Sequence, residues 1–240
     1  IHAGVLMKLG AYGIIRIGMT VLPEGASAWM PLLIGLGTVN VLYGAVSAMA
    51  QRDLKYVIGY SSVSHMGLVL MGLATLNPIG VSGAVLQMFS HGIMTALMFL
   101  LVGAIYDRTH TRDIYALKGL FSRMGVTGFF FAIAGLASMG LPGLSGFIAE
   151  FMVFTGAFRT YLPLAILAVI GAALTAVYIL RLLALPFFGE SDARWEHLTD
   201  ASPVEKAVGG AFVLIIIFVG VWPEPLLRLI NVSVDALPGV

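Results

Sequence analysis

The sequence predicts an all-α membrane protein that crosses the bilayer about seven times. Of its 240 residues, 59% are hydrophobic and 10% are charged, and the mean hydropathy is +0.99. An average soluble domain has roughly 45–50% hydrophobic and about 25% charged residues, so this chain has too few polar side chains to cover a water-soluble globule. Seven apolar stretches, most of them at least as long as the ~20 residues that a spanning helix requires, alternate with polar connections.

The predicted spans follow from these stretches. They are 3–22, 29–50, 54–76, 80–105, 126–158, 162–188 and 206–222. We expect Pro23–Ala28 to be a connection and the residues from Pro223 onward to be a tail. Because most connections are short, successive helices are expected to be antiparallel neighbours. The sequence therefore predicts one transmembrane domain over residues 1–240.

The fifth stretch is too long for one straight helix and contains a helix-breaking segment, Gly140–Gly146. Pro142 within it removes a backbone donor and clashes with the preceding turn, while the glycines loosen the chain. This pattern predicts a broken helix near Pro142. Backbone groups freed at this depth must face protein or water, and transporters place ions and substrates at such breaks. A purely structural kink is the alternative.

The basic side chains predict how the chain is oriented. Most of them lie in or next to connections on one side of the predicted spans, which we call the basic side. They are Arg52, Lys55, Arg108, Arg112, Lys118, Arg123, Arg194 and Lys206, whereas the opposite side has Arg159 and Arg228, with Arg16 near it. Because connections on the inner side carry the excess of Lys and Arg, we expect the basic side to face the cytoplasm or the matrix.

Four ionisable residues fall deep inside predicted spans: Lys8, His65, His91 and Glu150. Each histidine lies 11 residues into its span. Lys8 is about 14 residues, or ~21 Å, before the outer end of the first span, well inside a hydrocarbon core of ~30 Å. A charge at the bilayer centre costs about 2.5–3.5 kcal/mol on insertion scales, so we expect each of these residues to have a functional or structural role that offsets this cost.

Lysine, histidine and glutamate at one depth are suited to proton transfer. Burial favours their neutral forms, so such groups exchange protons near neutral pH. With hydroxyl groups nearby to hold waters, they predict a relay that runs in the membrane plane. The hydroxyl groups are those of Ser61, Ser62, Ser64, Ser90 and Thr95. The alternatives are packing roles for the histidines and structural ion pairs for Lys8 and Glu150.

A fifth candidate, Lys55, lies one residue inside its predicted span. It is either a further relay residue or a side chain that extends to the interface, since lysine can bury its stem and keep its charge in water. The sequence alone leaves both readings open.

Composition excludes several classes of chemistry. Without cysteine, the chain has no disulfide, thiolate-bound zinc, cysteine-ligated iron–sulfur cluster or cysteine nucleophile. A net charge of +1 gives no indication of nucleic-acid binding. Facing histidines also bind haem in membrane cytochromes, so a bis-histidine haem is an alternative for His65 and His91. That alternative does not explain Lys8 or Glu150, and a visible absorption spectrum would test it.

Five segments carry motifs that occur in one order along the chain. They are 3–13, 50–67, 87–92, 140–143 and 146–151, and they include Ser61-Ser62-Val63-Ser64-His65-Met66-Gly67, Gln87-Met88-Phe89-Ser90-His91-Gly92 and Gly140-Leu141-Pro142-Gly143. Together they resemble the antiporter-like proton-channel subunits of respiratory complex I. Because several long motifs agree over the whole chain, the resemblance is more specific than any single motif.

The resemblance implies a fold of fourteen transmembrane helices, two of them broken, arranged as two inverted five-helix repeats. This chain would supply the eighth to fourteenth helices and begin partway through a longer protein. In the family, a lysine of the eighth helix passes protons to a residue of the broken twelfth helix, and Lys8 and Glu150 match these positions. Glutamate there is typical of the branch called chain M or chain 4, and His65 and His91 match histidines on its hydrophilic axis.

The resemblance further implies NADH-driven quinone reduction coupled to proton pumping. Lys8 would store a proton, His65 and His91 would relay it, and Glu150 would be the terminal gate. This chain would bind no cofactor or metal, while partner subunits would hold flavin, iron–sulfur clusters and quinone. Its partners would be other membrane-arm subunits of complex I, including sister antiporter-like subunits, in a bacterial inner membrane or an equivalent energy-transducing membrane.

The same fold serves other proteins that these residues do not exclude. They are multisubunit sodium/proton antiporters, membrane-bound hydrogenases and the photosynthetic relatives of complex I. Their electron donors differ because other subunits bind them, so this chain alone does not identify the donor.

Overall fold

The computed structural model describes residues 1–240 as a bundle of helices without β-strands. The α-helices are α1 (Met7–Gly13), α2 (Pro23–Ala50), α3 (Leu54–Ala74), α4 (Pro78–Thr109), α5 (Gly125–Ser138), α6 (Ser145–Thr160), α7 (Leu162–Phe187), α8 (Pro203–Val221) and α9 (Glu224–Val234). The chain also has two π-helical segments, η1 (His2–Leu6) and η2 (Ile14–Met19), and two 3₁₀ turns, η3 (Leu120–Ser122) and η4 (Ala193–Trp195). The predicted all-α fold is confirmed.

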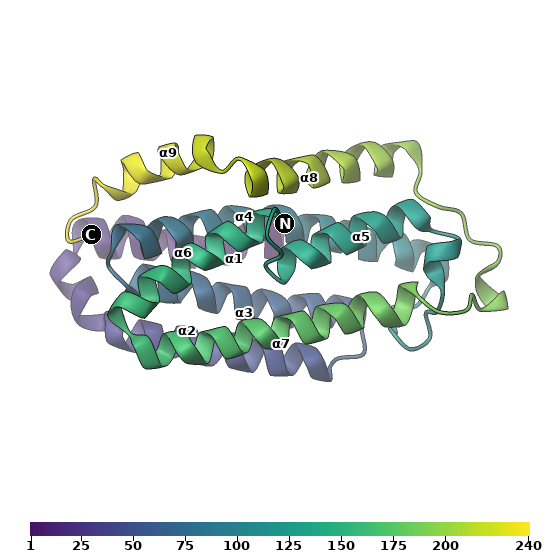
Figure 1. The fold of residues 1–240 in the computed structure, drawn as a ribbon, viewed down its shortest axis with the longest axis horizontal. Coiled ribbons are helices and arrows are strands. Elements are labelled where there is room, and N and C mark those ends of the chain that lie inside the picture. Colours follow the sequence, from purple (N-terminus) through teal and green to yellow (C-terminus); the bar gives the residue numbers. More distant parts are fainter.

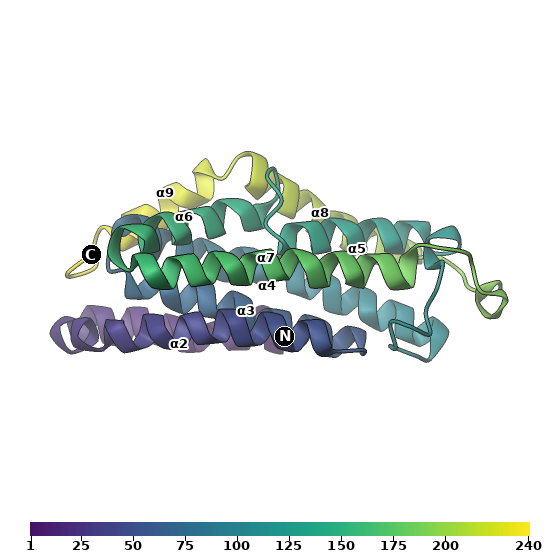
Figure 2. The same ribbon diagram turned by 60° about the horizontal axis from the view of Figure 1, so that its bottom comes forward.

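Most helices run along one long axis and stack in layers (Figures 1 and 2). In Figure 2, α2 lies at one face, α3 and α4 follow, and α8 and α9 lie at the opposite face beyond α5 and α6. The principal contacts of α3 are with α2 and α4, and α4 also packs on α6. Side chains where α3, α4 and α6 meet are therefore shielded by protein.

The predicted break near Pro142 is confirmed. Helix α5 ends at Ser138 and α6 begins at Ser145, and the two helices lie end to end with a loop between them (Figure 1). With 14 residues, α5 is about 21 Å long, which is shorter than a hydrocarbon core of ~30 Å. The two halves therefore cross as one unit. The loop N–H groups bond to the carbonyl groups of Gly135, Leu136 and Ala137, which leaves the Ser138 carbonyl free to accept a hydrogen bond from another helix.

The first predicted span is a helix in three parts. The segments η1, α1 and η2 follow one another without interruption from His2 to Met19. Lys8 lies in the α-helical part, between the two π-helical parts. π-helical turns are rare and often occur at functional sites.

Two predicted boundaries are wrong at the ends of helices. Pro23–Ala28 is part of α2 and not a connection, because Pro23 stands in the first turn, where a missing N–H costs nothing. Helix α4 continues past the predicted end at residue 105 to Thr109. In both cases polar or proline residues end the apolar stretch, while the helix itself continues.

The predicted tail after Pro223 is also corrected, since it contains helix α9. This helix is amphipathic and buries Ile230 and Val234 against the bundle. Asn231 also accepts a hydrogen bond from the Ser82 hydroxyl of α4 at 2.8 Å. Helices α8 and α9 follow one another along the bundle in Figure 1, much as α5 and α6 do.

Five helices are long and apolar enough to cross a membrane by length and composition: α2, α3, α4, α7 and α8. The other two predicted crossings are the three-part first helix and the broken pair α5 and α6. The seven predicted spans thus all correspond to helical segments of the structure.

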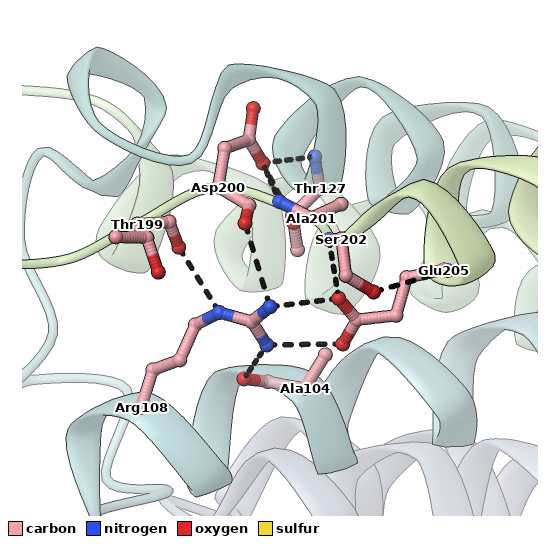
Figure 3. Close-up of polar contacts among 8 residues, drawn as sticks. All are labelled: Ala104, Arg108, Thr127, Thr199, Asp200, Ala201, Ser202 and Glu205. Atoms are coloured by element: carbon pink, nitrogen blue, oxygen red, sulfur yellow. Dashed lines mark hydrogen bonds and ion pairs between the residues drawn. The ribbon is translucent and has the colours of Figure 1, made fainter.

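At the basic side, a polar cluster fixes the connection between α7 and α8 to two other helices (Figure 3). The Arg108 guanidinium of α4 donates to the Glu205 carboxylate at 2.7 Å and to the backbone carbonyl groups of Thr199 and Asp200. The Asp200 carboxylate accepts from the backbone N–H of Val126 at 2.7 Å, in the first turn of α5. The connection therefore caps α5 and holds α8 against α4.

Candidate functional site

Four buried ionisable side chains from four helices form a row of contacts inside the bundle, which we call the relay row. Lys8 Nζ lies 2.7 Å from His91 Nδ1. The ring centroids of His91 and His65 are 5.2 Å apart, and His65 Nε2 lies 3.5 Å from Glu150 Oε1. None of these residues is more than 8% exposed. The structure thus brings together the four deep residues that the sequence predicts.

A close approach between the first helix and α4 places Lys8 beside His91. A Cβ atom on Gly92 would lie 2.9 Å from the carbonyl oxygen of Gly4, so the two backbones approach because residue 92 has no side chain. Lys8 Nζ also donates to the Ala3 carbonyl. When the Lys8 ammonium donates to Nδ1 of a neutral His91, the imidazole proton is on Nε2. That nitrogen has no hydrogen-bond partner within the chain.

Both ring nitrogens of His65 face backbone carbonyl oxygens. Nδ1 lies 2.8 Å from the Ser61 oxygen, and Nε2 lies 2.9 Å from the Ser138 oxygen. Because a carbonyl only accepts, both contacts are hydrogen bonds when the imidazole carries a proton on each nitrogen. The Ser138 carbonyl is available because α5 ends there. The break in the helix therefore supplies an acceptor for the protonated form of His65.

Glu150 lies in the second turn of α6, and its carboxylate lies against the break. A Cβ atom on Gly140 would lie 2.7 Å from Glu150 Oε2. Gly140 also has φ +70°, a backbone conformation that favours glycine. The carboxylate is 0.3 Å beyond the usual ~3.2 Å limit of a hydrogen bond to His65, so a small movement allows proton transfer between them.

The predicted hydroxyl groups divide into two sets. Ser61 Oγ lies 3.4 Å from His65 Nδ1, and Ser90 Oγ donates to Ser145 Oγ at 2.7 Å beside the break. The others donate to backbone carbonyl groups of their helices or of α2: Ser62, Ser64 and Thr95. Only the first set thus extends the polar contacts around the relay row.

Lys55 is not brought to the relay row. It is exposed in the first turn of α3, and its backbone N–H donates to the Asp53 carboxylate that caps this helix. Its position at the basic side fits a side chain that extends into the interface.

Three buried polar residues beside the relay row were not predicted. Tyr178 OH donates to Ser61 Oγ at 2.8 Å. The amide atoms of Gln87 and the hydroxyl of Ser138 have no hydrogen-bond partner within the chain. Gln87 precedes His91 by four residues on α4, so the shared helix face is a sequence signal that could have identified it. The contact between Tyr178 and Ser61 joins residues 117 positions apart, and no local pattern indicates it.

A haem held between His65 and His91 does not fit this geometry. Such a haem lies between two imidazole nitrogens that both point at its iron. Here the two rings pack on each other, with a tilt of 45°, and His91 Nδ1 contacts Lys8. The haem alternative is therefore incompatible with the arrangement of the two histidines.

Comparison with known protein families and proteins agrees with the motifs. The family described as NADH:quinone oxidoreductase/Mrp antiporter, TM, matches residues 1–175. One relative, from Synechococcus sp. (strain JA-3-3Ab), is named NAD(P)H-quinone oxidoreductase chain 4 2. It is 42% identical to this chain over an alignment of 245 residues, and the alignment covers 98% of this chain and 46% of that protein. The chain thus spans about half the length of the curated relatives it matches.

Solved structures share the fold. A chain of respiratory complex I from Thermus thermophilus with bound NADH is 32% identical with a TM-score of 0.91, over 96% of this chain and 49% of that chain. A chain of the Mrp complex from Dietzia sp. DQ12-45-1b has a TM-score of 0.88 at 22% identity, over 98% of this chain and 52% of that chain. The second match shows a common fold alone, whereas the first also agrees with the predicted family.

Proposed function

We propose that this chain, which belongs to the NADH:quinone oxidoreductase/Mrp antiporter family of transmembrane proteins, conducts protons through its relay row. The chain acts in the proton-translocating membrane subunit of an NAD(P)H:quinone oxidoreductase of the chain 4 type. The observation that carries this proposal is the row itself, which joins four helices through groups that each gain and lose a proton.

We infer the order of the proton steps from the order of the contacts along the relay row. In this proposal the first transfer runs from the Lys8 ammonium to His91 Nδ1, which lies 2.7 Å away. The second transfer runs between the neighbouring rings of His91 and His65. The third runs from His65 Nε2 to the Glu150 carboxylate, once a small movement shortens the 3.5 Å between them. Each transfer changes the charge beside the next group and thereby changes its proton affinity. Protons therefore move in steps along the membrane plane.

Redox chemistry belongs to partner subunits in this proposal. They would hold the flavin, the iron–sulfur clusters and the quinone, while this chain supplies a proton path beside sister antiporter-like subunits. Its relatives named chain 4 and its similarity to a chain of complex I support the presence of such partner subunits. An energy-transducing membrane such as the bacterial inner membrane is the corresponding location, with the basic side facing the cytoplasm.

The test is Glu150→Gln in the assembled complex, with proton pumping and quinone reduction measured together in inverted membrane vesicles. Glutamine keeps the shape of the carboxylate but does not accept a proton from His65. We expect pumping to fall by ~10-fold or more while the complex still assembles. Glu24→Gln is the matched control, because Glu24 is exposed in the first turn of α2, away from the relay row. Undiminished pumping in both Glu150→Gln and Lys8→Ala would refute the proposal.

A cation/proton antiporter is the second candidate, because the fold is shared with a chain of the Mrp complex. A hard cation prefers several oxygen ligands, whereas the relay row offers one carboxylate, two imidazoles and one ammonium. This residue set favours protons as the transported ion. Sodium-dependent proton movement that persists when quinone reduction is inhibited would support the antiporter instead.

A further inference from the structure

A pair of hydroxyl groups extends from the relay row toward helix α7. Tyr178 OH donates to Ser61 Oγ at 2.8 Å, and Ser61 Oγ lies 3.4 Å from His65 Nδ1. Tyr178 is 1% exposed and Ser61 is 4% exposed. Neither hydroxyl takes part in the contacts that join the four members of the row. They form a separate branch that reaches His65 from α7.

This branch leads to the basic side. Helix α3 begins there, and Ser61 and His65 lie 7 and 11 residues from its start. Helix α7 runs in the opposite direction beside α3, and Arg181 and Tyr178 precede its last residue, Phe187, by 6 and 9 residues. At ~1.5 Å per residue, Arg181 is the nearest of these four residues to the basic side and His65 is the deepest, with Ser61 and Tyr178 between them.

Arg181 holds together the outer end of this branch. Its guanidinium donates to the Met49 carbonyl at the end of α2 and to Tyr115 OH, the latter at 2.6 Å. The Tyr115 ring is also contacted by a second cation, since Arg52 and Arg181 lie 5.4 and 5.5 Å from its centroid. One arginine thus ties α7 to α2 and to the connection after α4.

A narrow cleft lies between this arginine and the buried tyrosine. Gln51, Ala48, Arg181 and Tyr178 are among the residues that line it. The cleft leaves no room for a water molecule with Arg181 in its present position. Because Arg181 lines the cleft while its guanidinium is anchored outside it, movement of this one side chain would widen the passage to Tyr178.

We propose that Tyr178 and Ser61 form the access route by which protons from the basic side reach His65, and that Arg181 is the gate of this route. The proposal rests on the proton translocation proposed above. In the closed position Arg181 bonds to Tyr115 and Met49. In the open position it releases them, and water enters the cleft as far as the Tyr178 hydroxyl.

Each step of this route moves one proton and leaves the two hydroxyl groups unchanged. A hydronium ion in the open cleft gives a proton to the Tyr178 oxygen, while the Tyr178 O–H bond breaks toward Ser61 Oγ. Ser61 gives its own hydroxyl proton to His65 Nδ1, which accepts when His65 carries its single proton on Nε2. Water remains in the cleft, and His65 gains one positive charge. The carbonyl groups of Ser61 and Ser138 stabilise this protonated product.

Tyr178→Phe in the assembled complex tests the route, because it removes one hydroxyl and keeps the ring. We expect pumping to fall by ~10-fold. Tyr56→Phe is the matched control: Tyr56 lies near the start of α3, is 58% exposed and should pump at the wild-type rate. Ser61→Ala should reproduce the loss, and Ser61→Thr, which keeps a hydroxyl, should restore pumping.

The gate is tested by labelling a single thiol introduced into residues 1–240, which contain no cysteine. Ala48→Cys places one thiol in the lining of the cleft, and a membrane-impermeant maleimide is added from the basic side. When Ala48→Cys is combined with Arg181→Ala, the thiol at residue 48 should be labelled ~10-fold faster, as expected when a charge-assisted hydrogen bond no longer holds the closed form. Arg181→Lys should label at an intermediate rate.

The outcomes separate the route from the relay row. Loss of pumping in Glu150→Gln together with wild-type pumping in Tyr178→Phe leaves the relay row intact and overturns the access route. Equal losses in Tyr178→Phe and Tyr56→Phe also overturn it. Wild-type pumping in both Glu150→Gln and Lys8→Ala overturns the proposed function itself. Equal labelling of Ala48→Cys with and without Arg181 overturns the gate.

Discussion

Lys8 Nζ lies 2.7 Å from His91 Nδ1, so two basic side chains that are 83 positions apart share one buried contact. The contact is a hydrogen bond when one partner offers a lone pair, which requires that one of the two be neutral. The only carboxylate of the relay row, Glu150, contacts His65 at the other end. Positive charge on two neighbouring members of the row is therefore unfavourable, and this favours transfer of one proton at a time.

Lys8→Arg tests whether Lys8 carries protons or only charge. A guanidinium is not deprotonated in proteins, so this variant keeps the charge but does not release a proton. We expect pumping by the assembled complex to fall by ~10-fold or more, measured in inverted vesicles. Arg16→Lys, at an exposed position on η2, is the control and should pump normally. Wild-type pumping by Lys8→Arg would mean that a fixed charge suffices at this position.

Gly140→Ala is expected to impair pumping more than Gly143→Ala. Both glycines have positive φ, +70° and +92°, so an alanine costs roughly 1–2 kcal/mol of backbone strain at either position. Only at residue 140 would the new Cβ lie 2.7 Å from Glu150 Oε2, because Gly143 has open space. Thermal stability and pumping should be measured for both variants. A similar loss of stability with a selective loss of pumping in Gly140→Ala is expected, and equal pumping would contradict the role of Gly140 in placing Glu150.

The sequence was sufficient for the spans and for the relay row because both follow from the cost of placing polar groups in a bilayer. Seven apolar stretches became helical segments, and each ionisable residue deep in a stretch became a member of the row. Pro142 and its glycines also predicted the break, since their backbone preferences are local.

The sequence failed where helices continue beyond apolar stretches and where contacts are remote. Pro23 suggested a connection, but proline fits the first turn of a helix as well as a loop. Helix α9 is too short and too polar on one face to register as a span. The hydrogen bond from Tyr178 to Ser61 depends on how α7 packs against α3, which no pattern within either helix specifies.

Asp200→Ala should destabilise the subunit by about 1 kcal/mol near neutral pH, the usual effect of removing a helix cap. Partial burial acts to raise the pKa of Asp200, but N–H groups of Val126, Ala201 and Thr127 outweigh it and lower this pKa below its ordinary value of 3.8. Since the pKa is lower in the folded protein, the stabilisation is complete above the unfolded value and is lost as the pH falls through the folded value. Thermal unfolding of the purified complex should show the difference from wild type shrinking below about pH 4.

The control for Asp200 is Asp192→Ala. A hydrogen bond from the Arg194 guanidinium lowers the pKa of Asp192 to about 2, and the Arg194 side chain of this surface pair is 63% exposed. Exposed ion pairs add little stability, so no change in the unfolding temperature is expected. Asp192 also caps the short η4 turn, so a change as large as that of Asp200→Ala would show that the cap on α5 has no special weight. Asp200→Asn, which keeps an acceptor for the cap, should lose less than Asp200→Ala.

Gln87→Met should raise stability and lower pumping at the same time. Gln87 is 0% exposed, and neither of its amide atoms has a hydrogen-bond partner within the chain. An unsatisfied buried amide costs about 1–3 kcal/mol, so an apolar side chain of similar size is expected to increase the midpoint of thermal unfolding. Such a cost is typical of positions kept for function, and Gln87 shares a face of α4 with His91. A more stable variant that pumps at the wild-type rate would show that Gln87 takes no part in the relay row, and a less stable one would contradict its lack of partners.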